Sequence, residues 1–116
     1  MAMARTMISS NDKALILEFK TKLPQGILSH LKKLIIYGSR VRGDASLDSD
    51  LDIVALVDKK NSDIEKKIDD IAYQVMWDHD FRPIISLKVF AEKQFYDAVK
   101  KGFSFYQHVA KEGIAV

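Results

Sequence analysis

The chain contains no cysteine, and this absence removes several kinds of protein chemistry at once. Disulfide bonds, thiolate zinc sites and cysteine nucleophiles are all excluded, and a reducing cytoplasm is the location we expect. Proline and glycine are also scarce, with 2 and 5 among 116 residues, and no Pro-, Gly- or Ser-rich linker divides the chain. We therefore expect one domain over residues 1–116, with residues 1–10 as its disordered start.

Long apolar runs and a strong charge of one sign are missing too. No stretch approaches the ~20 apolar residues that cross a membrane, and the N-terminal residues lack the apolar core of a secretory signal. The 18 basic and 16 acidic residues leave a net charge of +2, which is too even for bulk attraction to nucleic acid. We therefore expect neither membrane nor nucleic acid as a partner.

Helical and strand patterns alternate along the chain. They predict helices over 11–23, 62–77, 91–101 and 104–112, a helical turn over 27–31, and strands over 34–37, 51–57 and 84–90. Ser62 and Glu65 have the spacing of a capping box, and Gly113 before Ile114 is typical of a Schellman cap. This order predicts a small α/β or α+β domain with one sheet, and it leaves the strand order open.

Aromatic residues and histidines carry weaker signals. We expect Trp77 and the set Phe95, Tyr96 and Val99 in the core. A second cluster is expected to lie partly in the core, with an apolar patch for a partner as the alternative; it comprises Phe103, Phe105, Tyr106 and Val109. The histidines lack metal-ligand spacing, and we expect them at or near the surface; they are His30, His79 and His108.

One segment places glycine, serine and arginine directly after a predicted strand. Gly38 allows close backbone approach to a ligand, and a helical turn over 39–43 would offer N–H groups to phosphate oxygens. Ser39 adds a hydroxyl group. Arg40 and Arg42 are candidates for neutralising phosphate charge, and solvated turn residues are the alternative. The segment therefore predicts a phosphate site.

Two aspartates follow at the start of the next predicted strand. Side chains alternate along a strand, so Asp50 and Asp52 share a face, with Cα atoms roughly 6.5–7 Å apart. Two such carboxylates repel unless a cation lies between them, and hard oxygen ligands suit Mg²⁺. Carboxylates at this spacing can also bridge two ions in a phosphoryl-transfer site. Asp44 and Asp48, earlier in the loop, are expected to form turns.

Together these residues resemble the signature of the DNA polymerase beta-type nucleotidyltransferase superfamily, which is Gly-Ser, about ten residues, and Asp-x-Asp. Gly38-Ser39, the ten residues 40–49 and Asp50-Leu51-Asp52 match it without a gap. The short chain is similar to the minimal nucleotidyltransferases of bacteria and archaea. The resemblance implies a nucleotidyltransferase-like fold, a small mixed sheet flanked by helices.

The resemblance also implies an activity, the transfer of a nucleoside monophosphate from a nucleoside triphosphate, usually ATP, to a hydroxyl group. It assigns nucleotide binding to the Gly-Ser turn with its arginines, and catalysis and Mg²⁺ or Mn²⁺ binding to Asp50 and Asp52. Similar minimal proteins often act as antitoxins beside a small HEPN-type ribonuclease toxin, some by adenylylating it. A HEPN-like toxin is therefore the implied protein partner.

The later strand departs from the family pattern. Family enzymes usually carry a third carboxylate there, whereas residues 83–90 contain no acid and Ser86 takes its place. Asp78, Asp80 or a partner's carboxylate are possible substitutes. Two alternatives therefore stay open: a catalytically degenerate module that binds nucleotide or partner, and a small-molecule nucleotidyltransferase that acts as a homodimer.

Overall fold

The chain alternates helices with strands, and the computed structural model describes residues 8–42 and 49–116. The first half contains α1 (Ser10–Lys22), α2 (Gln25–Leu28), β1 (Leu31–Tyr37), α3 (Ser39–Arg42) and β2 (Leu51–Val57). The second half contains α4 (Ser62–Asp78), β3 (Ile85–Ala91), α5 (Glu92–Lys100), α6 (Ser104–Glu112) and β4 (Ile114–Ala115).

The strands form one mixed sheet in the order β3-β2-β1-β4. β1 pairs antiparallel with both β2 and β4, whereas β2 and β3 run parallel. β2 lies inside the sheet, and its apolar residues are buried on both faces, as is typical of an inner strand. The predicted mixed sheet with flanking helices is confirmed.

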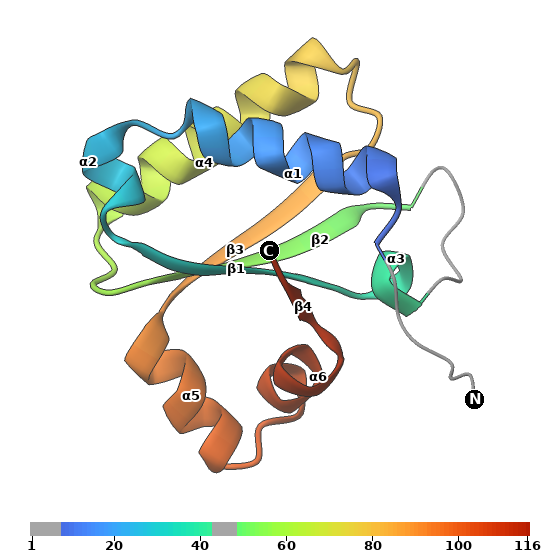
Figure 1. Cartoon of the computed structure of the whole chain (residues 1–116). Coiled ribbons are helices and arrows are strands. Elements are labelled where there is room, and N and C mark those ends of the chain that lie inside the picture. Colours follow the sequence, from blue (N-terminus) through green and yellow to red (C-terminus); the bar gives the residue numbers. More distant parts are fainter. Residues whose placement is uncertain (1–7, 43–48) are drawn as a thin grey trace.

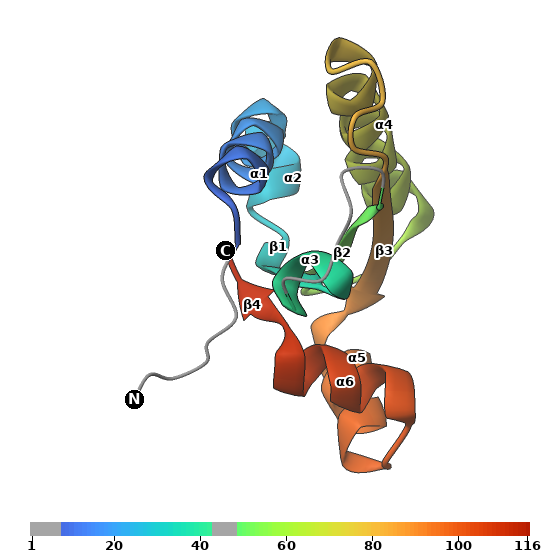
Figure 2. The same cartoon turned by 90° about the vertical axis from the view of Figure 1, so that its right-hand side faces the viewer.

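Helices cover both faces of this sheet, as Figures 1 and 2 show. α1, α2 and α4 lie on one face, and their apolar side chains pack with Leu51 and Ile53 of β2. α5 and α6 lie on the other face and pack with Val54 and Leu56. Alternate residues of β2 therefore belong to different layers, and Asp52 belongs to the face of α5 and α6. None of the helices among the described residues is long and apolar enough to cross a membrane.

Most element boundaries agree with the sequence patterns to within a few residues, and β2 begins and ends at the predicted positions. The capping-box prediction is wrong. The side chain of Asn61, one residue before Ser62, accepts a hydrogen bond from the Ile64 amide at 2.9 Å and caps α4. Two neighbouring residues with capping chemistry competed for one position, and the asparagine occupies it.

The chain end also differs from the prediction. Gly113 has φ −69° and ψ 154°, so it does not form the left-handed Schellman cap. The position requires glycine for a steric reason, because a Cβ atom there would lie 2.3 Å from Ile35 Cγ2 and 2.5 Å from the Val109 carbonyl oxygen. This close approach lets the chain pass from α6 directly into β4, a two-residue strand that the sequence patterns missed.

The core prediction for Trp77 is wrong, since 65% of this residue is exposed. Its ring lies at the outer side of α4, where Phe81 meets it edge-on with ring centroids 6.2 Å apart. Phe95 is fully buried, and Tyr96 and Val99 pack beside it. Of the second aromatic cluster, Val109 is buried, Phe105 and Tyr106 are half-buried, and Phe103 is exposed; the core reading holds for most of it.

Candidate active site

Three side chains from adjacent strands form a row on the sheet face that carries α5 and α6. Asp52 of β2 pairs with Tyr37 of β1 on one side and with Ser86 of β3 on the other. Residues paired in this way point to the same face, and neighbouring strands lie about 4.8 Å apart. Ser86 therefore stands beside Asp52, at the position where the sequence led us to look for a third carboxylate.

The turn after β1 lies directly against the second aspartate. Gly38 has φ +87°, a conformation that favours glycine, and its carbonyl accepts the amides of Val41 and Arg42 as α3 begins. A Cβ atom on Gly38 would lie 2.5 Å from Asp52 Oδ2. The structure thus brings the Gly-Ser turn and the Asp-x-Asp strand into contact.

The two aspartates interact electrostatically. Burial raises the pKa of Asp52 above its usual range, and the Asp50 carboxylate raises it further, while Lys88, Arg40 and Arg42 act in the opposite direction. A divalent cation between the carboxylates would relieve this repulsion, and Mg²⁺ accepts two carboxylates with water and phosphate oxygens as its other ligands. Asp50 and Asp52 therefore fit such an ion.

The site contains fewer acidic ligands than the family pattern. Within residues 8–42 and 49–116, no three His, Asp or Glu side chains are grouped closely enough to hold a metal ion. The proposed substitutes lie elsewhere: Asp78, at the end of α4, accepts a hydrogen bond from Lys22 of α1 at 3.2 Å, and Asp80 follows it in the turn before β3. Asp78 is thus paired within the layer of α1 and α4, on the face opposite Asp52. Asp44 and Asp48 lie outside the described residues.

Tyr37 and Lys88 complete the surroundings of Asp52. Burial, together with the nearby Asp52 carboxylate, raises the pKa of Tyr37 to about 12, so its hydroxyl group keeps its proton at neutral pH. Lys88 pairs with Val54, one step along the same face, and its Nζ lies 5.9 Å from the centre of the Phe105 ring. The Phe105 ring in turn meets Tyr37 edge-on, with centroids 5.6 Å apart.

The two arginines have different environments. Arg40 is largely buried and donates to both Asp12 carboxylate oxygens at 2.9 and 3.2 Å, and to the Ser49 carbonyl oxygen at 2.7 Å. The solvated-turn alternative is therefore wrong for Arg40, which links α3 to α1 and to Ser49, just before β2. Arg42 is about half exposed, and its Nη1 lies 3.8 Å from Glu112 Oε1 of α6. Both remain predicted nucleotide-binding residues.

A hollow of about 320 Å³ opens next to Gly38, between the end of β1, α3 and α6. Its lining residues are Tyr37, Gly38, Arg42, Phe105, His108, Val109 and Glu112. Tyr37, Gly38 and Arg42 belong to the strand and motif that the sequence indicated. The other lining residues come from α6, which the sequence did not place at the site. His108 and Glu112 are one helical turn apart, a spacing that places them on one face, yet nothing in the sequence showed that this face meets Gly38.

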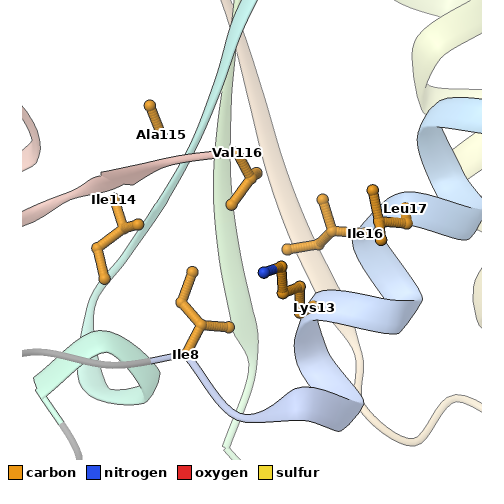
Figure 3. A pocket seen from close by; sticks show the side chains of 7 residues that line it. All are labelled: Ile8, Lys13, Ile16, Leu17, Ile114, Ala115 and Val116. Atoms are coloured by element: carbon orange, nitrogen blue, oxygen red, sulfur yellow. The ribbon is translucent and has the colours of Figure 1, made fainter.

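A second hollow, of about 380 Å³, lies between α1 and β4 (Figure 3). Its lining is apolar apart from Lys13, and consists of Ile8, Lys13, Ile16, Leu17, Ile114, Ala115 and Val116. Ile16 belongs to the core on the α1 side of the sheet. This hollow therefore has neither the acidic groups nor the glycine turn of the candidate site.

Comparison with known families agrees with this geometry. A family model described as a nucleotidyltransferase domain matches residues 13–107, a range that contains the Gly-Ser turn and both aspartates. The chain therefore belongs to the nucleotidyltransferase domain family, and its substrate class is the nucleoside triphosphates. A search of curated proteins finds no match to the chain.

Proposed function

We propose that the chain is a minimal, Mg²⁺-dependent nucleotidyltransferase that moves AMP from ATP to a hydroxyl group of a partner protein, and that this partner is a HEPN-type toxin. In this reaction the acceptor oxygen bonds to the α-phosphorus and the bond to pyrophosphate breaks. The hydroxyl proton passes to water or to a basic group of the partner as the new phosphodiester forms. Mg²⁺ held by Asp50 and Asp52 would neutralise charge on the reacting phosphate.

The observation that carries the proposal is the contact between Gly38 and Asp52. It brings a turn suited to phosphate and a pair of carboxylates suited to Mg²⁺ within reach of one triphosphate. Arg42 and Lys88 add positive charge around Asp52, which favours an anionic substrate. The family match supports nucleotidyl transfer, and the toxin as acceptor rests on the resemblance to minimal antitoxins.

Ser86 favours a second candidate, a degenerate module that binds nucleotide or partner without catalysis. It stands beside Asp52 where a carboxylate would complete the metal site or accept the proton. Loss of a general base alone typically costs 10²–10⁴-fold in rate. A partner that supplied the missing group would restore transfer, and neutralisation by contact alone would need no such group.

The deciding experiment incubates the chain with α-labelled ATP, Mg²⁺ and the product of the neighbouring gene. We expect a labelled partner whose mass has increased by one AMP, and no label with the variant Asp50→Asn/Asp52→Asn. Asp58→Asn is the matched control, because Asp58 follows β2 at its other end and is exposed. This control should label as the wild type does.

The result also separates the two candidates. An unlabelled partner that still forms a stable complex, with the wild type and with the double variant alike, would remove the enzymatic proposal and leave neutralisation by contact. Label that persists in the double variant would contradict the role of the two aspartates.

A further inference from the structure

The hollow beside Gly38 lies on the same side of the sheet as Asp52. Tyr37 and Asp52 are paired neighbours on the α5 and α6 face, and both Tyr37 and Gly38 line the hollow. Gly38 also lies directly against the Asp52 carboxylate, so one residue joins the wall of the hollow to that group. The nucleoside of a triphosphate whose α-phosphate lies at Asp52 can therefore reach this opening.

The lining of the hollow combines ring surfaces with polar groups. Phe105 and Tyr37 provide aromatic rings in edge-to-face contact, with centroids 5.6 Å apart. Glu112 supplies a carboxylate whose oxygens lie 3.8 Å from Arg42 Nη1 and 3.5 Å from His108 Nδ1. Aromatic rings with a few polar groups are typical of small-ligand sites, and about 320 Å³ falls within their usual range.

Two larger hollows lie on the wrong side of the sheet for a nucleotide bound at Asp52. The apolar hollow of Figure 3 includes Ile16, which packs on the face of α1 and α4. A polar hollow of about 340 Å³ lies between α1 and the turn before β3, and His79 and Arg82 are among its lining residues. Its helical wall, α1, also belongs to the face opposite Asp52.

We infer that the hollow formed by Tyr37, Gly38, Phe105, His108 and Glu112 is the nucleoside subsite of this nucleotidyltransferase, with α6 as its specificity-determining wall. The inference rests on the proposed function, because it takes the triphosphate to lie at Gly38 and the aspartates. His108 and Glu112 would bind the polar edge of the nucleoside, and the aromatic rings would contact its flat surface.

The test compares two ligands that share a triphosphate and differ in the nucleoside. Calorimetry measures the dissociation constants of Mg-ATP and of Mg²⁺ with inorganic tripolyphosphate, for the wild type, His108→Ala and Glu112→Gln. We expect the wild type to prefer Mg-ATP, and each variant to lose about three- to tenfold in affinity for Mg-ATP relative to tripolyphosphate. The ratio of the two constants cancels general changes in the charge of the site.

His79→Ala is the matched control. His79 is also an exposed histidine beside a glutamate, with its Nε2 2.9 Å from Glu18 Oε1, but it lines the polar hollow on the opposite face. This variant should keep the wild-type ratio, and a reduced ratio here with unchanged ratios in the α6 variants would overturn the inference. So would a wild type that binds both ligands equally, although the triphosphate site would then stand. A wild type that binds neither ligand would remove the proposed function itself, and the subsite with it.

Discussion

Gly38 and Asp52 are so close that no side chain fits between them. A Cβ atom on residue 38 would lie 2.5 Å from the Asp52 carboxylate, and the glycine has a φ of +87°. Contact distances this short force a neighbour to move, and this φ is itself unfavourable for residues with a Cβ. The glycine of the Gly-Ser motif is therefore explained by the position of the second aspartate.

Gly38→Ala should destabilise the protein by about 1–3 kcal/mol, since it adds a steric clash to an unfavourable backbone conformation. Denaturant unfolding of the single variants and of Gly38→Ala/Asp52→Ala measures the two contributions. In the double variant the clash is absent, so the effects should not be additive and about 1 kcal/mol from the backbone should remain. Strict additivity would contradict a contact between these residues.

Asp52→Asn should unfold at the same or a higher temperature than the wild type at neutral pH without divalent metal. Burial and the Asp50 charge raise the pKa of Asp52, so the folded protein holds its proton more tightly than the unfolded chain. The stability of the wild type therefore falls as pH rises from 3.8 through the raised pKa, and the asparagine variant escapes that loss. Melting curves at a series of pH values measure the difference, which should vanish below pH 3.8.

Asp58→Asn provides a control of opposite sign. A hydrogen bond from His30 lowers the pKa of Asp58, so its contribution to stability is present above pH 3.8 and is lost as pH falls through the lowered pKa. This variant should melt below the wild type at neutral pH. If both substitutions shifted the melting temperature in the same direction, the electrostatic explanation for Asp52 would be wrong.

Asp12→Ala should destabilise the protein by about 3 kcal/mol, because it removes the Asp12 carboxylate from the largely buried Arg40 guanidinium. Asp70→Ala removes an exposed partner from Lys66 and should change stability by less than about 0.5 kcal/mol. Urea unfolding of both variants makes the comparison. Equal effects would mean that the Asp12–Arg40 pair does not hold α3 against α1.

Ser86→Asp should increase the affinity for Mn²⁺ by about tenfold or more, because it adds a third carboxylate beside Asp52. Without metal the same change should destabilise the protein by about 0.2–1 kcal/mol through like-charge repulsion. Calorimetry with Mn²⁺ and thermal unfolding measure the two effects. Ser86→Asn has nearly the same shape without the charge, so a similar gain in affinity there would argue against coordination.

The motif residues and the inner strand could be predicted from sequence, because each is defined by a pattern within one short segment of the chain. β2 is a continuous apolar run after Asp52, and such a run, bounded by polar residues, is typical of a buried strand. The position of Ser86 beside Asp52 followed from the family pattern. The exposure of Trp77 was also readable in principle, because residue 77 lies about 200° around α4 from buried Val75.

The remaining features depend on contacts between distant segments. β4 has two residues and no pattern of its own; its pairing with Ile35 and Ile36 makes it a strand. Asp12 and Arg40 meet only because α1 packs beside α3, and no local signal connects them. The same holds for α6, whose His108 and Glu112 reach Gly38 through the order of strands in the sheet, which the sequence patterns left open.

The attachment of α6 has a thermodynamic consequence. The helix that forms one wall of the hollow is fastened to β1 through Gly113 and the two residues of β4, a very short segment of pairing. Opening of such a segment is expected to require less free energy than global unfolding. A nucleoside that binds against α6 therefore stabilises the closed form of this segment and should slow the hydrogen exchange of the Ile114 and Val116 amides. By the same linkage, a substitution that loosens β4 should weaken nucleoside binding by the same free energy.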